Sequence, residues 1–236
     1  MGVVRIWFIA TRISGNDGVS LEAVRWRNIL VRMGHKVTLV AGELDRPGIL
    51  IPELHFNWPK VTELHDKVVY EKNHYRKIER EVFEVAGKIE GRIREAFNGT
   101  KPDLLIVANV LSLPMHFPLA VALTRVIDEL EIPTIARHHD FWWERKKYLK
   151  SHLFHFFERW FPSKLSNLKH VVINSIAREE LKKRTGIEAD VIWDSFDFKN
   201  NIKAKKDRYS KNFRNDFEIE RDDLVFLLVS ESILDY

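Results

Sequence analysis

The sequence contains no cysteine and no glutamine. The absence of cysteine excludes a disulfide framework, a cysteine-ligated zinc or iron–sulfur site and a cysteine nucleophile. Depletion of both residues beside abundant Lys, Arg and Glu is a weak sign of a thermophilic source. The chain also lacks a long apolar run: a membrane-spanning helix needs about 20 consecutive apolar residues, and charges interrupt every run here. The apolar start, 3–10, is too short for a secretory signal. We therefore predict a cytoplasmic protein.

What is present fits a folded globular chain. A composition of 45% hydrophobic and 31% charged residues is typical of a globular protein. A length of 236 residues allows one large domain or one domain with an appendage. The formal charge is +4, and the stretch from Lys199 to Arg214 contains seven basic residues and one acidic residue. The excess is therefore local and the rest of the chain is slightly acidic. We interpret 195–221 as a charged linker and predict no nucleic-acid partner.

Short apolar runs alternate with amphipathic segments along the first 194 residues. Strands are predicted at 3–10, 36–41, 103–108, 133–137, 170–174 and 190–193, with one short strand near 53–56. Helices are predicted at 21–33, 63–97, 115–131, 151–166 and 175–185, the first capped by Ser20 and ended by Gly34. This alternation predicts an α/β fold with a Rossmann-like, doubly wound, mostly parallel sheet. After the linker, a lone apolar strand at 224–229 makes 222–236 resemble the start of a second such domain.

Ligands of doubly wound sheets bind beyond the carboxyl ends of the strands. The loop after the first strand contains Gly15, Asp17 and Gly18 and leads into a helix. Its glycines allow close backbone approach, and the free amides of the helix N-terminus suit a diphosphate. The loop matches neither the dinucleotide fingerprint nor a Walker loop. The alternative is an ordinary loop rich in turn formers.

Polar residues also follow two later strands. Asn109 and Ser112 come after the strand at 103–108, where they are placed to bind hydroxyl groups or to cap the next helix. Asn174 follows the strand at 170–174, where a helix N-cap is the commoner role and ligand binding is the alternative.

The segment 137–145, Arg-His-His-Asp-Phe-Trp-Trp-Glu-Arg, follows the strand at 133–137. His138 and His139 suit proton transfer or hydrogen bonding to a polyol near neutral pH, and nearby aromatic rings suit stacking on a sugar or base. Adjacent residues of an extended segment point to opposite sides, which disfavours a metal site. The alternative is a hydrogen-bonded loop. The aromatic helix at 151–166 is interpreted as core, with a membrane-surface contact as its alternative.

Taken together, these segments resemble the N-terminal domain of retaining GT-B glycosyltransferases of family 4. The resemblance covers residues 1–229. It is carried by the loop Gly15 to Ser20, by Gly34-His35-Lys36-Val37, by the segment 137–145, and by Val171 to Ser175 with the helix that follows.

The resemblance implies an enzyme that transfers a sugar from a nucleotide-diphosphate donor to an acceptor hydroxyl without a cofactor or bound metal. It implies that Gly18 and neighbouring amides meet the donor phosphates. It implies a catalytic role for His139 beside the donor sugar, with His138 as the runner-up. Asp17 and Asn109 become candidates for the acceptor hydroxyls. The full set of candidate binding residues is Gly15, Asp17, Gly18, Asn109, Ser112, His138, Asp140 and Asn174.

The sequence departs from that family at its end. The Glu-x7-Glu motif and the basic pair of the family's second domain are missing, and Trp193-Asp194-Ser195 stands where a Pro-Asn segment is usual. We therefore expect the acceptor-side half of such an enzyme, weak or inactive alone, with a separate C-terminal half as a candidate partner. The alternative is a non-catalytic module that binds carbohydrate or a protein partner.

Overall fold

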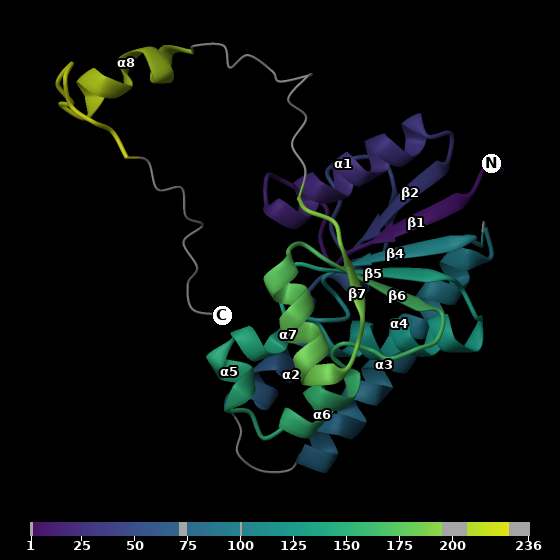
Figure 1. Ribbon diagram of the computed structural model, residues 1–236. Helices are drawn as coiled ribbons and strands as arrows, with labels where there is room; N and C mark the ends of the chain where they lie inside the picture. Colours follow the sequence, from purple (N-terminus) through teal and green to yellow (C-terminus); the bar gives the residue numbers. More distant parts are fainter. Residues whose placement is uncertain (1, 71–74, 100, 195–206, 227–236) are drawn as a thin grey trace. The chain divides into compact units, whose positions relative to one another are not determined.

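The computed structural model describes residues 2–70, 75–99, 101–194 and 207–226 (Figure 1). The chain divides into two compact units, 1–195 and 196–236, each of which is described by itself.

Unit 1 contains a seven-stranded sheet in which every pair of neighbouring strands is parallel. Its order is β3-β2-β1-β4-β5-β6-β7. The strands are β1 Arg5–Ile9, β2 Lys36–Ala41, β3 Ile49–Leu50, β4 Leu104–Ala108, β5 Thr134–His138, β6 Leu168–Val172 and β7 Ala189–Val191. This topology confirms the predicted doubly wound, Rossmann-like fold. The order reverses between β1 and β4, which is where such sheets bind ligands.

Helices cover the two faces of the sheet unequally. The helices of unit 1 are α1 Gly18–Arg32, α2 Pro59–Tyr70, α3 Tyr75–Phe97, α4 Phe117–Glu129, α5 Lys146–Leu149, α6 Phe154–Trp160 and α7 Ser175–Thr185. Side chains alternate along β1, so Ile6 and Phe8 join the apolar cluster beneath α1, while Trp7 and Ile9 join a larger cluster that includes α2, α3 and α4. Figure 1 shows α1 on one side of the sheet and α2, α3, α4 and α6 on the other.

The start of α1 differs from the prediction. The cap is Asp17 rather than Ser20, because the Asp17 carboxylate accepts the Ser20 N–H at 3.0 Å and the Ser20 hydroxyl at 2.6 Å. Ser20 therefore lies inside the first turn. The predicted glycine at the helix end is confirmed, since Gly34 follows the cap Met33 with a φ of +92°.

Two predicted elements between β2 and β4 are corrected. The short strand lies at Ile49–Leu50 instead of 53–56, because Pro52 lacks the N–H that a ladder needs and begins a 3-10 turn at Pro52–Leu54. The single helix predicted over 63–97 is divided into α2 and α3, and residues 71–74 between them lie outside the described residues.

The segment predicted as one helix over 151–166 contains the shorter helix α6, and a separate short helix, α5, precedes it. Phe156, Phe157 and Phe161 are buried in the larger apolar cluster, as the core interpretation predicts. The membrane-surface contact stays a prediction. Among the described residues, no helix is both long and apolar enough to cross a bilayer.

Unit 2 is described over 207–226. The predicted linker here contains a helix, α8 Arg208–Asp216, whose N-cap Asp207 accepts the Ser210 N–H at 2.7 Å. Leu224, Val225 and Phe226 are not in a strand, contrary to the prediction for 224–229, and the rest of that stretch lies outside the described residues. Lys199, with the first part of the basic stretch, also lies outside them.

Candidate functional site

The loop before α1 is held in shape by charged groups. Arg12 pairs with Asp17 at 3.2 Å. Gly15, in the left-handed region at φ +73°, donates its N–H to Asp45 at 2.8 Å. Asp45 also pairs with Arg46, and the Arg46 and Gly15 hydrogen bonds lower the pKa of Asp45 to about 2. The Gly15 amide is therefore already engaged by a carboxylate of the chain itself, and its predicted contact with a ligand stays a prediction.

The first turn of α1 keeps donors available. Gly18 and Val19 are the first two helical residues, and their N–H groups have no acceptor within the part of the chain that the structure describes. A Cβ at Gly18 would meet nothing within 4 Å, so the backbone here is open. These amides point along the positive end of the helix dipole, which favours an anionic ligand.

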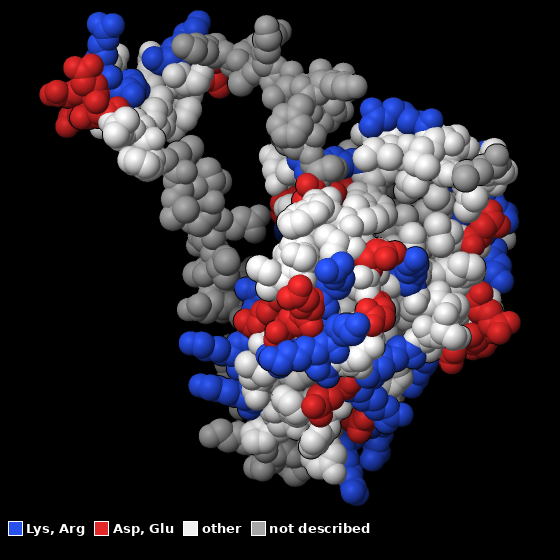
Figure 2. All heavy atoms as spheres, in the orientation of Figure 1, with Lys and Arg blue, Asp and Glu red and all other residues white. Residues whose placement is uncertain are grey.

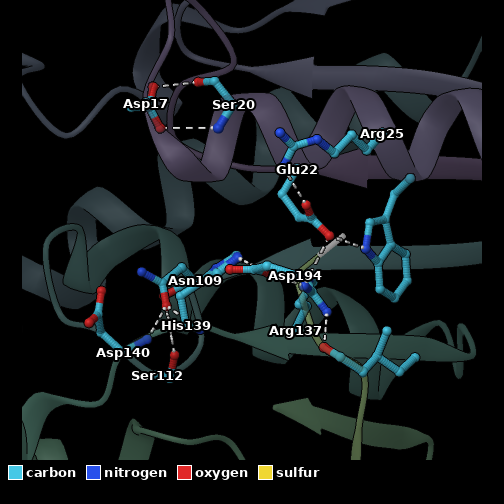
Figure 3. A network of polar contacts seen from close by, with 12 residues as sticks. Asp17, Ser20, Glu22, Arg25, Asn109, Ser112, Arg137, His139, Asp140 and Asp194 are labelled. Carbon is cyan, nitrogen blue, oxygen red and sulfur yellow. Dashed lines mark hydrogen bonds and ion pairs between the residues drawn. The ribbon is translucent and has the colours of Figure 1, made fainter. Parts of the chain in front are cut away.

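A buried ion network joins α1 to the end of β5 (Figure 3). The Arg137 side chain is 0% exposed and pairs with Glu22 at 3.2 Å and with Asp194 at 2.5 Å. It also donates to the Ile192 carbonyl at 3.1 Å and lies 4.7 Å from the Trp26 ring centroid. Glu22 is itself buried, whereas the Asp194 side chain is 49% exposed. The network fixes the loop-bearing helix beside the end of β5.

His139 stands next to this network. Its side chain is 12% exposed, and both ring nitrogens are buried with no hydrogen-bond partner among the described residues. Nε2 lies 3.6 Å from the Asp194 carboxylate. Burial lowers the pKa of His139, nearby Arg137 lowers it further, and Asp194, Asp140 and Glu22 act in the opposite direction. The predicted catalytic residue is thus a buried imidazole with unused hydrogen-bonding capacity.

Asn109 shapes the turn that presents His139. Its side-chain carbonyl accepts the N–H groups of His139 and Asp140, each at 3.1 Å, and the Ser112 hydroxyl at 3.3 Å. Asn109 has a φ of +61°, a conformation that Asn tolerates better than most residues. Ser112 is fully buried and bonded to Asn109, and its predicted contact with substrate stays a prediction. Asn109 stabilises the turn that contains His139 and does not cap the next helix. The N-cap of that helix, α4, is His116.

His138 points into the fold. It is 1% exposed, and its Nε2 lies 2.9 Å from His170 Nδ1. Burial, with the neighbouring His170, holds the pKa of His138 well below its usual range. This buried, hydrogen-bonded position favours His139 over His138 as the residue beside the donor sugar, and the substrate contact of His138 stays a prediction.

The remaining candidates are placed as follows. Asp140 is partly exposed and lies 3.6 Å from Arg145. Asn174 caps α7 by accepting the Ala177 N–H at 2.7 Å, as its commoner role predicts. Asp17 caps α1. Ligand contacts of these three residues stay predictions.

Five residues of this edge were not among the predicted site residues: Arg12, Glu22, Arg46, Arg137 and Asp194. Arg46 is near enough to Asp17 for the two charges to interact, so two cations border the loop. Glu22 was detectable in principle, because an acidic residue occupies a buried position of an amphipathic helix directly after the loop. Asp194 follows the last strand of unit 1 and carries no comparable sequence signal. No group of three or more His, Asp or Glu among the described residues is placed to hold a metal ion.

Two curated proteins are similar in sequence. A mannosylglucosylglycerate synthase of Petrotoga mobilis is 33% identical over 233 residues, covering 95% of this chain and 52% of that protein. A mannosylglucosylglycerate synthase of Thermotoga maritima is 33% identical over 201 residues, covering 80% and 44%. By sequence, the chain is similar to glycosyltransferases. It spans about half the length of these relatives. Their organisms support the prediction of a thermophilic source.

Solved structures that align with this chain have low TM-scores and low sequence identities. No family model matches the chain. An alpha-glucosyltransferase in complex with UDP-glucose and DNA containing an abasic site aligns with a TM-score of 0.40 and 14% identity, over 82% of this chain and 42% of that one. CalG4, the calicheamicin glycosyltransferase, aligns with a TM-score of 0.30 and 16% identity, over 84% and 47%. These TM-scores are too low to support a conclusion about this chain.

Proposed function

We propose that this chain is the acceptor-side half of a retaining glycosyltransferase, which transfers a sugar from a nucleotide-diphosphate donor to an acceptor hydroxyl. The proposal is supported by the similarity to two synthases of a glycosylated compound. One observation carries it: the Glu22–Arg137 ion pair brings the open N-terminus of α1 and the His139 turn to one edge of the sheet. A diphosphate and a sugar would meet at that edge.

The donor diphosphate is assigned to the first turn of α1. The amides of Gly18 and Val19 would donate to its oxygens, and Arg12 and Arg46 would add positive charge from the loop side. Such preorganised donors stabilise the charge that develops on the leaving diphosphate as the glycosidic bond breaks.

His139 is assigned to the donor sugar. As that bond breaks, the sugar acquires oxocarbenium character, so a charged imidazolium beside it would be unfavourable. The lowered pKa of His139 keeps the ring neutral near pH 7. A neutral imidazole can accept a hydrogen bond from a sugar hydroxyl without adding positive charge.

The relatives suggest the acceptor class. Each is named for a product in which mannosyl and glucosyl groups are joined to glycerate, a hydroxy acid. We propose that this chain binds an acceptor of the same class, such as glucosylglycerate, and that transfer retains the anomeric configuration without a metal ion. Because the chain spans half of those proteins, we expect weak transfer by the chain alone.

The donor assignment is tested by calorimetry with UDP and GDP on two variants of one residue. Gly18 is the first residue of α1, where proline is tolerated, and Asp17 before it has the extended conformation that proline requires (φ −68°, ψ 157°). Gly18→Pro therefore removes one amide donor with little strain, and Gly18→Ala keeps it. We expect nucleotide binding about 10-fold weaker in Gly18→Pro, in line with the loss of one charge-assisted hydrogen bond, and unchanged binding in Gly18→Ala. Equal nucleotide affinities of Gly18→Pro and Gly18→Ala would contradict the assignment of the diphosphate to this loop.

The reaction is tested by incubating the chain with nucleotide sugars and glucosylglycerate in the presence of a chelator, with products followed by NMR. A product whose new linkage has the donor's anomeric configuration supports the proposal. Binding of both substrates without transfer, even after the second half of a relative is added, would favour the carbohydrate-binding alternative.

A further inference from the structure

A lysine near the site has no carboxylate partner. Lys147 belongs to α5, and its Nζ lies 3.5 Å from Nε2 of His65 in α2 and 5.0 Å from the centroid of the Tyr148 ring. The Tyr148 hydroxyl lies 3.3 Å from the same His65 nitrogen. No Asp or Glu lies within ion-pair distance of Lys147 in the described part of the chain. An ammonium is thus held against two aromatic side chains without a counter-ion.

Its surroundings make this arrangement unfavourable for the free protein. Lys147 is partly buried, and burial together with nearby Arg145 lowers its pKa to about 8. His65 provides no negative charge, because burial lowers its pKa to about 4 and leaves the ring neutral. Lys67, two residues after His65 in α2, shows the ordinary alternative, since it pairs with Glu63 at 2.6 Å and with Glu81 at 2.7 Å.

The lysine is connected to the candidate site. Arg145, two residues before it, is 45% exposed and pairs at 3.6 Å with Asp140, the neighbour of His139. Arg145 therefore links the turn that contains His139 and Asp140 to α5, the helix of Lys147. Figure 2 shows Lys and Arg side chains gathered on the surface where Figure 1 places α5.

Packing alone would not require a charge at this position. The Lys147 ammonium lies over the Tyr148 ring, a contact that offsets part of its desolvation cost, whereas a methionine could cover the ring without that cost. Unpaired, perturbed charges beside a candidate site are more often kept for a ligand. A carboxylate placed between Lys147 and Arg145 would remove that cost by supplying the missing counter-charge.

We propose that Lys147, with Arg145, forms a subsite for the carboxylate of an acidic acceptor. The inference rests on the proposed function and adds to it the residues that distinguish an acidic acceptor from a neutral one. The donor diphosphate is the other anion at this edge, but it is assigned to the α1 amides. The subsite is therefore expected to affect acceptor binding and to leave nucleotide binding unchanged.

The test compares two ligands that differ only in charge, glucosylglycerate and glucosylglycerol, by calorimetry on the full chain. Lys147→Met keeps the length of the side chain and removes the charge. Lys146→Met is the matched control, because Lys146 is an exposed neighbour in the same helix. We expect glucosylglycerate to bind at least 10-fold more weakly to Lys147→Met than to the parent chain, and glucosylglycerol and UDP to bind the two equally. Lys146→Met should resemble the parent chain.

A second measurement does not depend on a variant. NMR titration of the Lys147 ammonium group should show its pKa rise when glucosylglycerate is added and stay constant with glucosylglycerol. The proposal is overturned if Lys147→Met binds glucosylglycerate normally, if Lys146→Met loses as much affinity, or if neither glycoside binds. Normal nucleotide binding with any of these results leaves the proposed donor site standing, whereas a parent chain that binds neither UDP nor GDP would refute the proposed function itself.

Discussion

At the scale of single residues, Arg137 is the side chain on which the candidate site depends most. It is fully buried, yet it is charged and bonded to residues 115 and 57 positions away in the sequence, Glu22 and Asp194. The sequence placed Arg137 at a strand end, but no local pattern predicts partners so distant. The same limit applies to the burial of Ser112 and His138, which is decided by β6 and the turn after β4 rather than by their own neighbours in sequence.

Replacement of Arg137 by methionine should destabilise unit 1 by about 3–5 kcal/mol, because the buried Glu22 carboxylate then loses its buried counter-ion and keeps only the partly exposed Arg25. The double variant with Glu22→Gln should recover a large part of this loss. Urea unfolding followed by circular dichroism measures both. The control is Arg94→Met, which breaks the exposed pair with Glu129 and should cost less than about 1 kcal/mol. Similar losses for the two arginines would contradict a buried role for Arg137.

Replacement of Asp194 by asparagine should lower the pKa of His139 further. Asp194 favours the protonated ring, and its loss also leaves the Arg137 charge less compensated. Titration of the His139 ring protons by NMR measures the shift. Asp190→Asn removes the same charge from β7, where Asp190 pairs with Lys169 instead, and should leave His139 unchanged. A pKa of His139 that does not move in Asp194→Asn would show that the two groups are not coupled.

At the scale of elements, the sequence was most informative where one residue type determines a boundary. Gly34 and Gly186 end α1 and α7 in the left-handed region, as expected. The failures came where two signals competed. Ser20 and Asp17 are both good caps, and the hydrogen bonds that choose between them are a property of the folded loop. His116 caps α4 although histidine is not a typical capping residue, because its ring also reaches the Glu53 carbonyl at 2.9 Å.

The His116 cap should make the fold sensitive to acid. Burial lowers the pKa of His116 to about 4 from an ordinary value near 6.5. Between pH 6.5 and 4, His116 is therefore protonated in the unfolded chain and neutral in the folded chain. The stability that His116 contributes is complete above pH 6.5 and is lost as the pH falls toward 4. His65 and His170, whose pKa values burial also lowers to about 4, add to the effect.

Urea unfolding at pH 7.5, 6 and 5 tests this dependence. His116→Asn keeps an oxygen able to accept the Leu119 N–H and removes the titrating ring. We expect it to be less stable than the parent at pH 7.5 and to lose less stability between pH 7.5 and 5. His155→Asn, at an exposed position, serves as the control. A parallel pH dependence of the His116 variant and the parent would refute the assignment.

At the scale of the whole molecule, the alternation of strands and helices was enough to predict the parallel sheet and its doubly wound order. Hydrophobic runs identify buried strands regardless of their partners, and right-handed crossovers leave few ways to connect them. The prediction could not show which strand ends approach one another closely enough to share charges. That information came from the register of β5, β6 and β7 and from the position of Asp194 after β7.

Unit 1 contains its own apolar core and should fold without unit 2. We expect a chain that ends at residue 195 to unfold at the same temperature as the full chain. The same shortened chain with Asp194→Ala should be less stable by about 1.5–3 kcal/mol, the value of a hydrogen bond between charged groups. Calorimetric melting of the three chains measures this. Equal stability of the two shortened chains would show that Asp194 adds nothing to the fold.

The uneven cover of the sheet has a consequence for dynamics. Only Ser20, Glu22 and Ala23 are buried in α1, whereas seven residues are buried in α3 and nine in α4. The helix to which the donor diphosphate is assigned should therefore detach from the sheet more easily than α3 or α4, and its backbone hydrogens should exchange with solvent faster than theirs. A ligand bound at the first turn of α1 should therefore slow deuterium uptake along the whole helix, including its C-terminal end, which the ligand does not contact.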